Sequence, residues 1–138
     1  MTKKTNFITP PSTISFLVGA IKCNDNPAAA QLLIKSAIAA VYEKPEAQVT
    51  KEEVEAVVGL IQTLEPKDTI EAMLAAQIIC AHIQGMNSMS KNYLNSKGHG
   101  LMLLRLSHQS LEQLQRYRGK LSQNINVTYN TLIKGVAS

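Results

Sequence analysis

The sequence predicts a mainly α-helical protein, a small bundle of four or five helices with a central antiparallel hairpin and a C-terminal β-strand. The apolar residues are mostly Ala, Leu, Ile and Val, and only 4% of residues are aromatic, which favours helix packing over a sandwich. Apolar residues recur at helical spacing between recognisable cap residues, and after Gly119 they alternate instead. A chain of 138 residues is long enough to bury one core.

The N-terminal part is expected to hold a tail and two helices. Pro10 and Pro11 impose extended backbone on residues 1–11, and Ser12 can cap a short helix over residues 13–22. Asn26 followed by Pro27 is a typical helix start, so the next helix is expected over residues 28–43.

The central part is expected to contain a hairpin of two helices. The Thr50–Glu53 spacing is that of a capping box and opens a third helix. Asp68 is placed to cap the longest helix, over residues 69–93, whose nearly all-round apolar character predicts the most buried position. A short loop over residues 95–100 then leads to a helix over residues 101–118, so the two helices should pair in antiparallel fashion.

The end of the chain has the periodicity of a strand. Large residues stand on alternate positions, at Leu121, Ile125, Val127, Tyr129 and Ile133. A lone strand leaves its backbone groups unpaired, so we expect these strands to pair between copies of the chain, with Ile125, Val127 and Tyr129 at the contact. The sequence thus divides into a tail (1–11), a helical domain (12–119) and a strand tail (120–138).

Charge is distributed unevenly along the chain. Residues 1–72 sum to −2, whereas residues 73–138 sum to +6 with a single acid, Glu112. A basic C-terminal half indicates an anionic partner, either nucleic acid or an acidic protein surface.

The sequence offers no convincing catalytic, cofactor or metal site. Cys80 and His82 stand two apart on an expected helix and so point in different directions, and no Cys-x-x-Cys or His-x-x-x-His pair occurs. His108 and Glu112 share a helix face, but no oxyanion donors accompany them. We therefore expect a protein that is not an enzyme and that needs no cofactor.

The strongest polar feature is the segment from Arg116 to Lys120. Arg116, Arg118 and Lys120 could contact a phosphate backbone, with Tyr117 as a stacking partner. The alternative is that these cations offset the helix dipole while Gly119 ends the helix in a left-handed conformation.

Two segments give the chain a family resemblance. Met73-Leu-Ala-Ala-Gln77 and Arg116-Tyr-Arg-Gly-Lys120, followed by the alternating tail, resemble a family of small uncharacterised proteobacterial proteins. The resemblance covers residues 66–129, and the tail lacks the His-rich and Gly-Gly endings of that family. It implies a bacterial origin and an architecture, and it carries no activity.

The function that these observations favour is a non-enzymatic, homo-oligomeric helical protein with a basic surface for nucleic acid, similar in general plan to phage-packaging or regulatory subunits. The alternative is a protein-interaction adaptor whose C-terminal strand joins a partner's sheet. Cys23 and Cys80 lie in apolar segments as expected of reduced thiols, and no segment is expected to span a membrane, so we expect a cytoplasmic protein.

Overall fold

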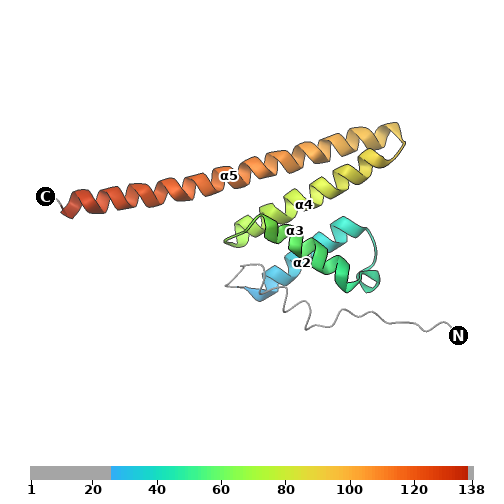
Figure 1. Ribbon diagram of the computed structural model, residues 1–138, viewed down its shortest axis with the longest axis horizontal. Helices are drawn as coiled ribbons and strands as arrows, with labels where there is room; N and C mark the ends of the chain where they lie inside the picture. Colours follow the sequence, from blue (N-terminus) through green and yellow to red (C-terminus); the bar gives the residue numbers. More distant parts are fainter. Residues whose placement is uncertain (1–25, 137–138) are drawn as a thin grey trace.

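The computed structural model describes residues 26–136, with side chains described for residues 26–120. Its elements are four helices, α2 (Pro27–Tyr42), α3 (Lys51–Thr63), α4 (Thr69–Ser90) and α5 (Leu94–Val136), with a short 3₁₀ turn, η1 (Glu46–Gln48), before α3 (Figure 1). The mainly helical fold class is confirmed, and no strand occurs between residues 26 and 136. The expected tail over residues 1–11 and helix over residues 13–22 lie outside the described residues.

Helices α2, α3 and α4 each begin at the cap residue that the sequence indicates. The Asn26 side chain accepts a hydrogen bond from the backbone of Ala29 at 3.1 Å, and Pro27 occupies the first turn. The Thr50 and Glu53 side chains exchange hydrogen bonds with each other's backbone N–H, a complete capping box. The Asp68 carboxylate accepts from the backbone N–H of Glu71 at 2.8 Å. Local chemistry therefore sets where these helices start.

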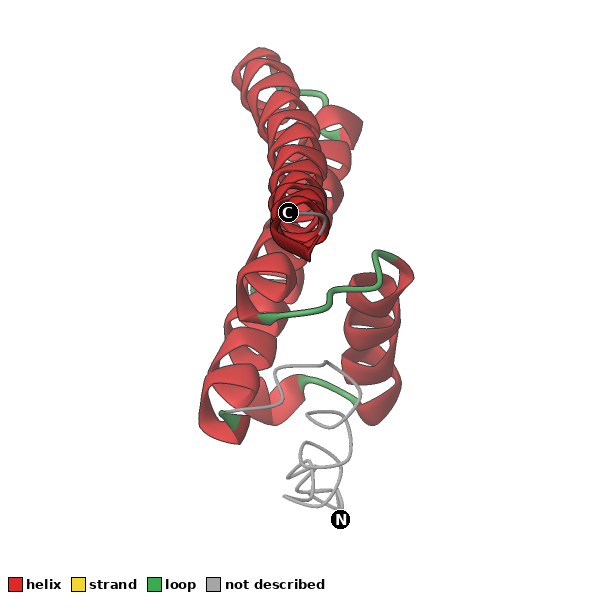
Figure 2. Cartoon of the chain, turned by 90° about the vertical axis from the view of Figure 1, so that its left-hand side faces the viewer, coloured by secondary structure: helices red, strands yellow, loops and turns green. Residues whose placement is uncertain are grey.

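Helix α4 is the central element. It packs against α5 on one side and against α2 and α3 on the other (Figure 1). Figure 2 shows that the described elements are helices joined by loops. Helices α4 and α5 run antiparallel, as predicted for the hairpin. The side of α4 that faces α2 and α3 buries small residues against β-branched ones, and the core comprises Ala30, Ile34, Ala37, Ile38, Val41, Val49, Val54, Val57, Val58, Ile61, Ala72, Ala75 and Ala76.

The contact between α4 and α5 is built on small residues. Gly85 on α4 and Gly100 on α5 are both buried, and an added Cβ at Gly100 would lie 2.9 Å from the backbone oxygen of Gly85. The two backbones therefore approach closely at this point. The prediction of a loop over residues 95–100 is wrong, because α5 already begins at Leu94. Gly100 therefore lies within a helix and serves helix packing rather than a turn.

Helix α5 passes through Gly119, and its described backbone continues as a helix to Val136, in the segment where the sequence predicts a strand. No described glycine has a positive φ angle, so Gly119 does not end the helix in a left-handed conformation. The sequence also satisfies a helical period here, since Leu114, Leu121, Ile125 and Leu132 are spaced by seven, four and seven positions. Alternation and helical spacing coexist in this segment, and the helical backbone continues from a helix that is already formed.

Candidate nucleic-acid interface

The candidate segment, Arg116 to Lys120, lies on α5 opposite the connection between α3 and α4. Arg118 is the best-connected side chain there. Its Nε and Nη2 atoms donate to Oε2 of Glu71 at 3.1 and 2.9 Å, and Nη2 also donates to the carbonyl oxygens of Leu64 at 2.6 Å and Glu65 at 3.2 Å. The Glu71 side chain is only 1% exposed, so its carboxylate depends on these partners.

The position of Arg118 follows from how α3 ends. The last carbonyl groups of a helix have no partner within the helix, and a guanidinium offers several donors in one plane. Arg118 uses them for the two carbonyls just after α3 and for a carboxylate in the first turn of α4, which also accepts from the backbone N–H of Lys67 at 3.0 Å. One side chain thus joins α3, α4 and α5.

Tyr117 lies in the same network. Its hydroxyl donates to Oδ2 of Asp68 at 2.8 Å, while the other oxygen of Asp68 caps α4. This hydrogen bond, which favours the neutral phenol, raises the pKa of Tyr117 above its usual value. Two of the four residues expected to bind nucleic acid, Tyr117 and Arg118, therefore already have partners within the fold.

Arg116 and Lys120 are exposed, and they stand four positions apart on α5. Arg105, also exposed, lies eleven positions before Arg116, or about 16 Å along the helix axis. The acid in this stretch, Glu112, pairs with His108 at 3.5 Å across the helix surface. We name Arg105, Arg116 and Lys120 the outer basic face of α5.

The residues expected at a strand contact, Ile125, Val127 and Tyr129, belong to the part of α5 for which only the backbone is described. No side chain is described at these positions, so the expected contact through Ile125, Val127 and Tyr129 stays a prediction.

The His, Cys, Asp and Glu side chains of residues 26–120 do not gather into a metal site. No group of three or more His, Cys, Asp or Glu side chains in that range could hold a metal ion. Ser107 is buried and donates to the carbonyl of Ile78 at 2.9 Å, so it does not serve the exposed His108–Glu112 pair. Burial raises the pKa of the Cys80 thiol, which disfavours the reactive thiolate.

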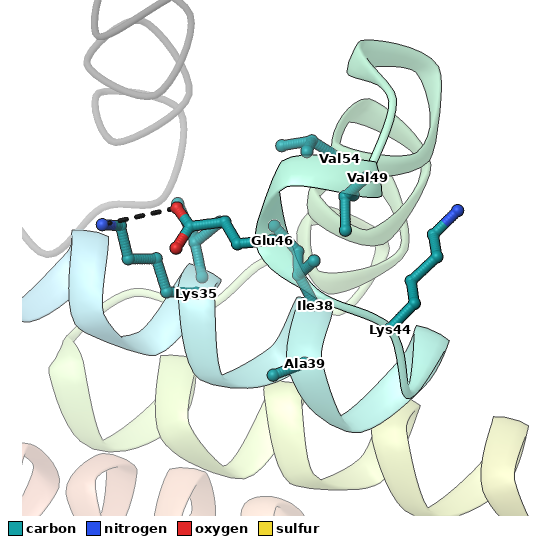
Figure 3. A pocket seen from close by; sticks show the side chains of 8 residues that line it. Lys35, Ile38, Ala39, Lys44, Glu46, Val49 and Val54 are labelled. Carbon is teal, nitrogen blue, oxygen red and sulfur yellow. Dashed lines mark ion pairs between the residues drawn. The ribbon is translucent and has the colours of Figure 1, made fainter. Parts of the chain in front are cut away.

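A pocket between α2 and the start of α3 has charged residues at its rim and aliphatic residues inside it (Figure 3). Its charged groups are paired, because Lys35 contacts Glu46 at 3.5 Å and Lys44 contacts Glu53 at 2.7 Å. The hydrogen bond from Lys44 is the largest reason for the lowered pKa of Glu53. With both lysines engaged and an aliphatic interior of Ile34, Ile38, Val49 and Val54, the pocket presents no reactive group.

The Glu71–Arg118 pair cannot be predicted from the sequence pattern. Its partners lie 47 positions apart, and the single local sign is an acid in the first turn of α4, which is ordinary at a helix start.

None of the described helices is both long enough and apolar enough to cross a bilayer. No protein-family model matches the chain, and neither a curated protein nor a solved structure shows significant similarity to it.

Proposed function

We propose that this is a non-enzymatic, homo-oligomeric helical protein that binds the backbone of nucleic acid through the outer basic face of α5. The observation that carries the proposal is the exposure of Arg105, Arg116 and Lys120 on one helix without an ion-pair partner among the described side chains. Exposed cations without an ion-pair partner are available to phosphate groups.

Assembly is part of the proposal because three cations make a weak site. Neutralising a few phosphates gives low, strongly salt-dependent affinity, and bringing two or more copies together multiplies the contacts. A cytoplasmic location, expected from cysteines in apolar segments, belongs to the same proposal.

The test compares two variants with the same change in net charge. In the first, Arg105, Arg116 and Lys120 are changed to Gln, and in the second the body lysines Lys35, Lys51 and Lys67 are changed to Gln. Binding to a duplex oligonucleotide is measured by fluorescence anisotropy at several salt concentrations. The first variant should lose affinity and flatten the dependence of log K on log salt by about one unit per contact removed, whereas the second should bind like the wild type.

Equal affinities of the two variants for DNA would contradict a site on α5. A wild-type protein that does not bind DNA at low salt would remove nucleic acid from the proposal.

The alternative function, a protein-interaction adaptor, would then be better supported. The observation that favours it is that α5 extends well past the start of α4 (Figure 1), so a partner would meet a projecting helix instead of the strand expected from the sequence.

A further inference from the structure

The turn of the α4–α5 hairpin exposes large apolar side chains at its end. Tyr93 is 74% exposed and Leu94 is 91% exposed. Three further side chains of this kind stand on the adjoining turns, and the whole set is Met86, Tyr93, Leu94, Leu101 and Met102. We name this surface the hairpin tip.

The hairpin tip lies beyond the region where α2 and α3 cover α4. The end of α2 reaches α4 at Gln84, whose side chain donates to the carbonyls of Ala40 and Val41. The turn between α4 and α5 stands away from α2 and α3 in Figure 1. The apolar side chains of the tip thus have no cover from the body of the described fold.

The hairpin tip is also positively charged. No Asp or Glu occurs between Glu71 and Glu112, a stretch that contains the whole tip, whereas Lys91 and Lys97 flank Tyr93 and Leu94 and are exposed. Aromatic residues and Met combined with depletion of acids are typical of a protein–protein contact, and the charge calls for an acidic partner.

The same chain carries a surface of the complementary kind on α3. Glu52, Ala56 and Leu60 follow one another at intervals of four on that helix, and all three are exposed. Glu55 is exposed beside them and forms only a surface pair with Lys51 at 3.6 Å. We name this the α3 face. The apolar part of this face is small and consists of Ala56 and Leu60; a Cβ built at the neighbouring Gly59 would meet nothing within 4 Å. The carboxylates of Glu52 and Glu55 stand at one end of the face.

Charge on the body as a whole agrees with this complementarity. Residues 26–71 contain eight carboxylates and four lysines, a net charge of −4, against the acid-free stretch around the tip. A nucleic acid would satisfy the lysines of the tip but would leave its apolar side chains in water. A second copy of this chain offers apolar and acidic surface together.

We infer that the hairpin tip of one copy docks on the α3 face of a second copy, with Lys91 and Lys97 opposite Glu52 and Glu55. In the inferred dimer the contact is reciprocal about a twofold axis, an arrangement that would double the buried area of a single small tip and close the assembly. The inference rests on the homo-oligomer of the proposed function and specifies its interface.

The experiment exchanges charge between the two surfaces. One variant carries Lys91→Glu and Lys97→Glu, the other carries Glu52→Lys and Glu55→Lys, and mass is measured by light scattering after size exclusion without nucleic acid. The wild type should have twice the mass of one chain. Each variant alone should lose half of that mass, because like charges then face each other, and an equimolar mixture of the two should recover it. A control with Lys35→Glu and Lys67→Glu should keep the wild-type mass, and circular dichroism should show that all variants are folded.

Charge variants that retain the wild-type mass would overturn the inference, and so would a mixture that stays at the mass of one chain. A third contrary result would be binding to anionic vesicles that is lost in the variant with Lys91→Glu and Lys97→Glu while its mass is unchanged. In each of these cases an oligomeric wild type would leave the proposed function standing. A wild type with the mass of one chain would instead remove both the interface and the homo-oligomer. Failure of DNA binding with intact mass would affect the nucleic-acid part alone.

Discussion

Arg116 and Arg118 stand two positions apart on α5, yet they meet different surroundings. Arg118 reaches a buried carboxylate and two carbonyl groups, whereas Arg116 is exposed. A cation that compensates a buried charge affects stability, and a cation on the surface affects partners. The roles of the two arginines can therefore be separated by experiment.

Replacing Arg118 by Ala should lower the free energy of unfolding by about 2–3 kcal/mol, less than for a fully enclosed pair because Arg118 is partly exposed. The loss comes mainly from Glu71, which would be left charged and buried. Urea unfolding followed by circular dichroism measures it. Arg116→Ala is the matched control and should stay within about 0.5 kcal/mol of the wild type. Adding Glu71→Gln to Arg118→Ala should recover part of the loss, and equal losses for both arginines would refute the assignment.

At the scale of elements, the hairpin depends on close contact between α4 and α5. A Cβ at Gly100 would lie 2.9 Å from the backbone oxygen of Gly85 and 3.0 Å from the backbone nitrogen of Met89, so the helices would have to separate. Gly119 is also helical, but a Cβ there would meet nothing within 4 Å. The same substitution should consequently have opposite effects at the two positions.

Gly100→Ala should destabilise the protein by about 1–3 kcal/mol through overpacking, and Gly119→Ala should stabilise it by up to about 1 kcal/mol because alanine favours helix. Thermal unfolding of the two variants beside the wild type gives the comparison. Stabilisation by Gly100→Ala would show that the two helices do not approach as closely as described.

The start of α3 predicts a pH dependence. The hydrogen bond from Lys44, with the backbone N–H of Thr50, lowers the pKa of Glu53 in the folded protein below its ordinary value of 4.5. A carboxylate with a lowered folded pKa contributes stability that is present above the unfolded pKa and is lost as the pH falls through the folded pKa. The stability advantage of the wild type over Glu53→Gln should accordingly be constant near neutrality and should shrink below pH 4.5. Unfolding curves between pH 6 and pH 3 test this, with Glu52→Gln as a control of equal charge change, and an advantage that persists at pH 3 would contradict it.

At the scale of the whole molecule, α5 serves two regions. Up to Arg118 it completes the hairpin and holds the end of α3, and beyond Lys120 it extends past α4 (Figure 1). Every core residue of the described side chains lies between Ala30 and Leu114. No residue of the described core therefore belongs to the extension.

A chain that ends after Lys120 should retain cooperative urea unfolding, with a midpoint close to that of the full-length protein. The reason is that removing residues 121–138 deletes none of the described core. Circular dichroism measures the transition, and Leu114→Ala in the full chain is the contrasting variant, which should cost about 2–5 kcal/mol. A shortened protein without a cooperative transition would show that the extension is needed for folding.

The sequence by itself determined the helical class, the starts of α2, α3 and α4 and the pairing of α4 with α5, because cap residues and short connections act within a few positions. The same locality leaves the segment after Gly119 undecided, because two periodicities coexist there and no local signal chooses between them. Local sequence likewise does not distinguish Arg118 from Arg116 within the segment from Arg116 to Lys120.

Only the tertiary structure decided that Gly100 packs against Gly85, that Arg118 compensates Glu71 and that Arg116 and Lys120 stay exposed. Each of these depends on contacts between residues far apart in the chain, or on their absence. Burial and pairing are properties of the folded surface, and they separate a structural arginine from a surface arginine of the same sequence pattern.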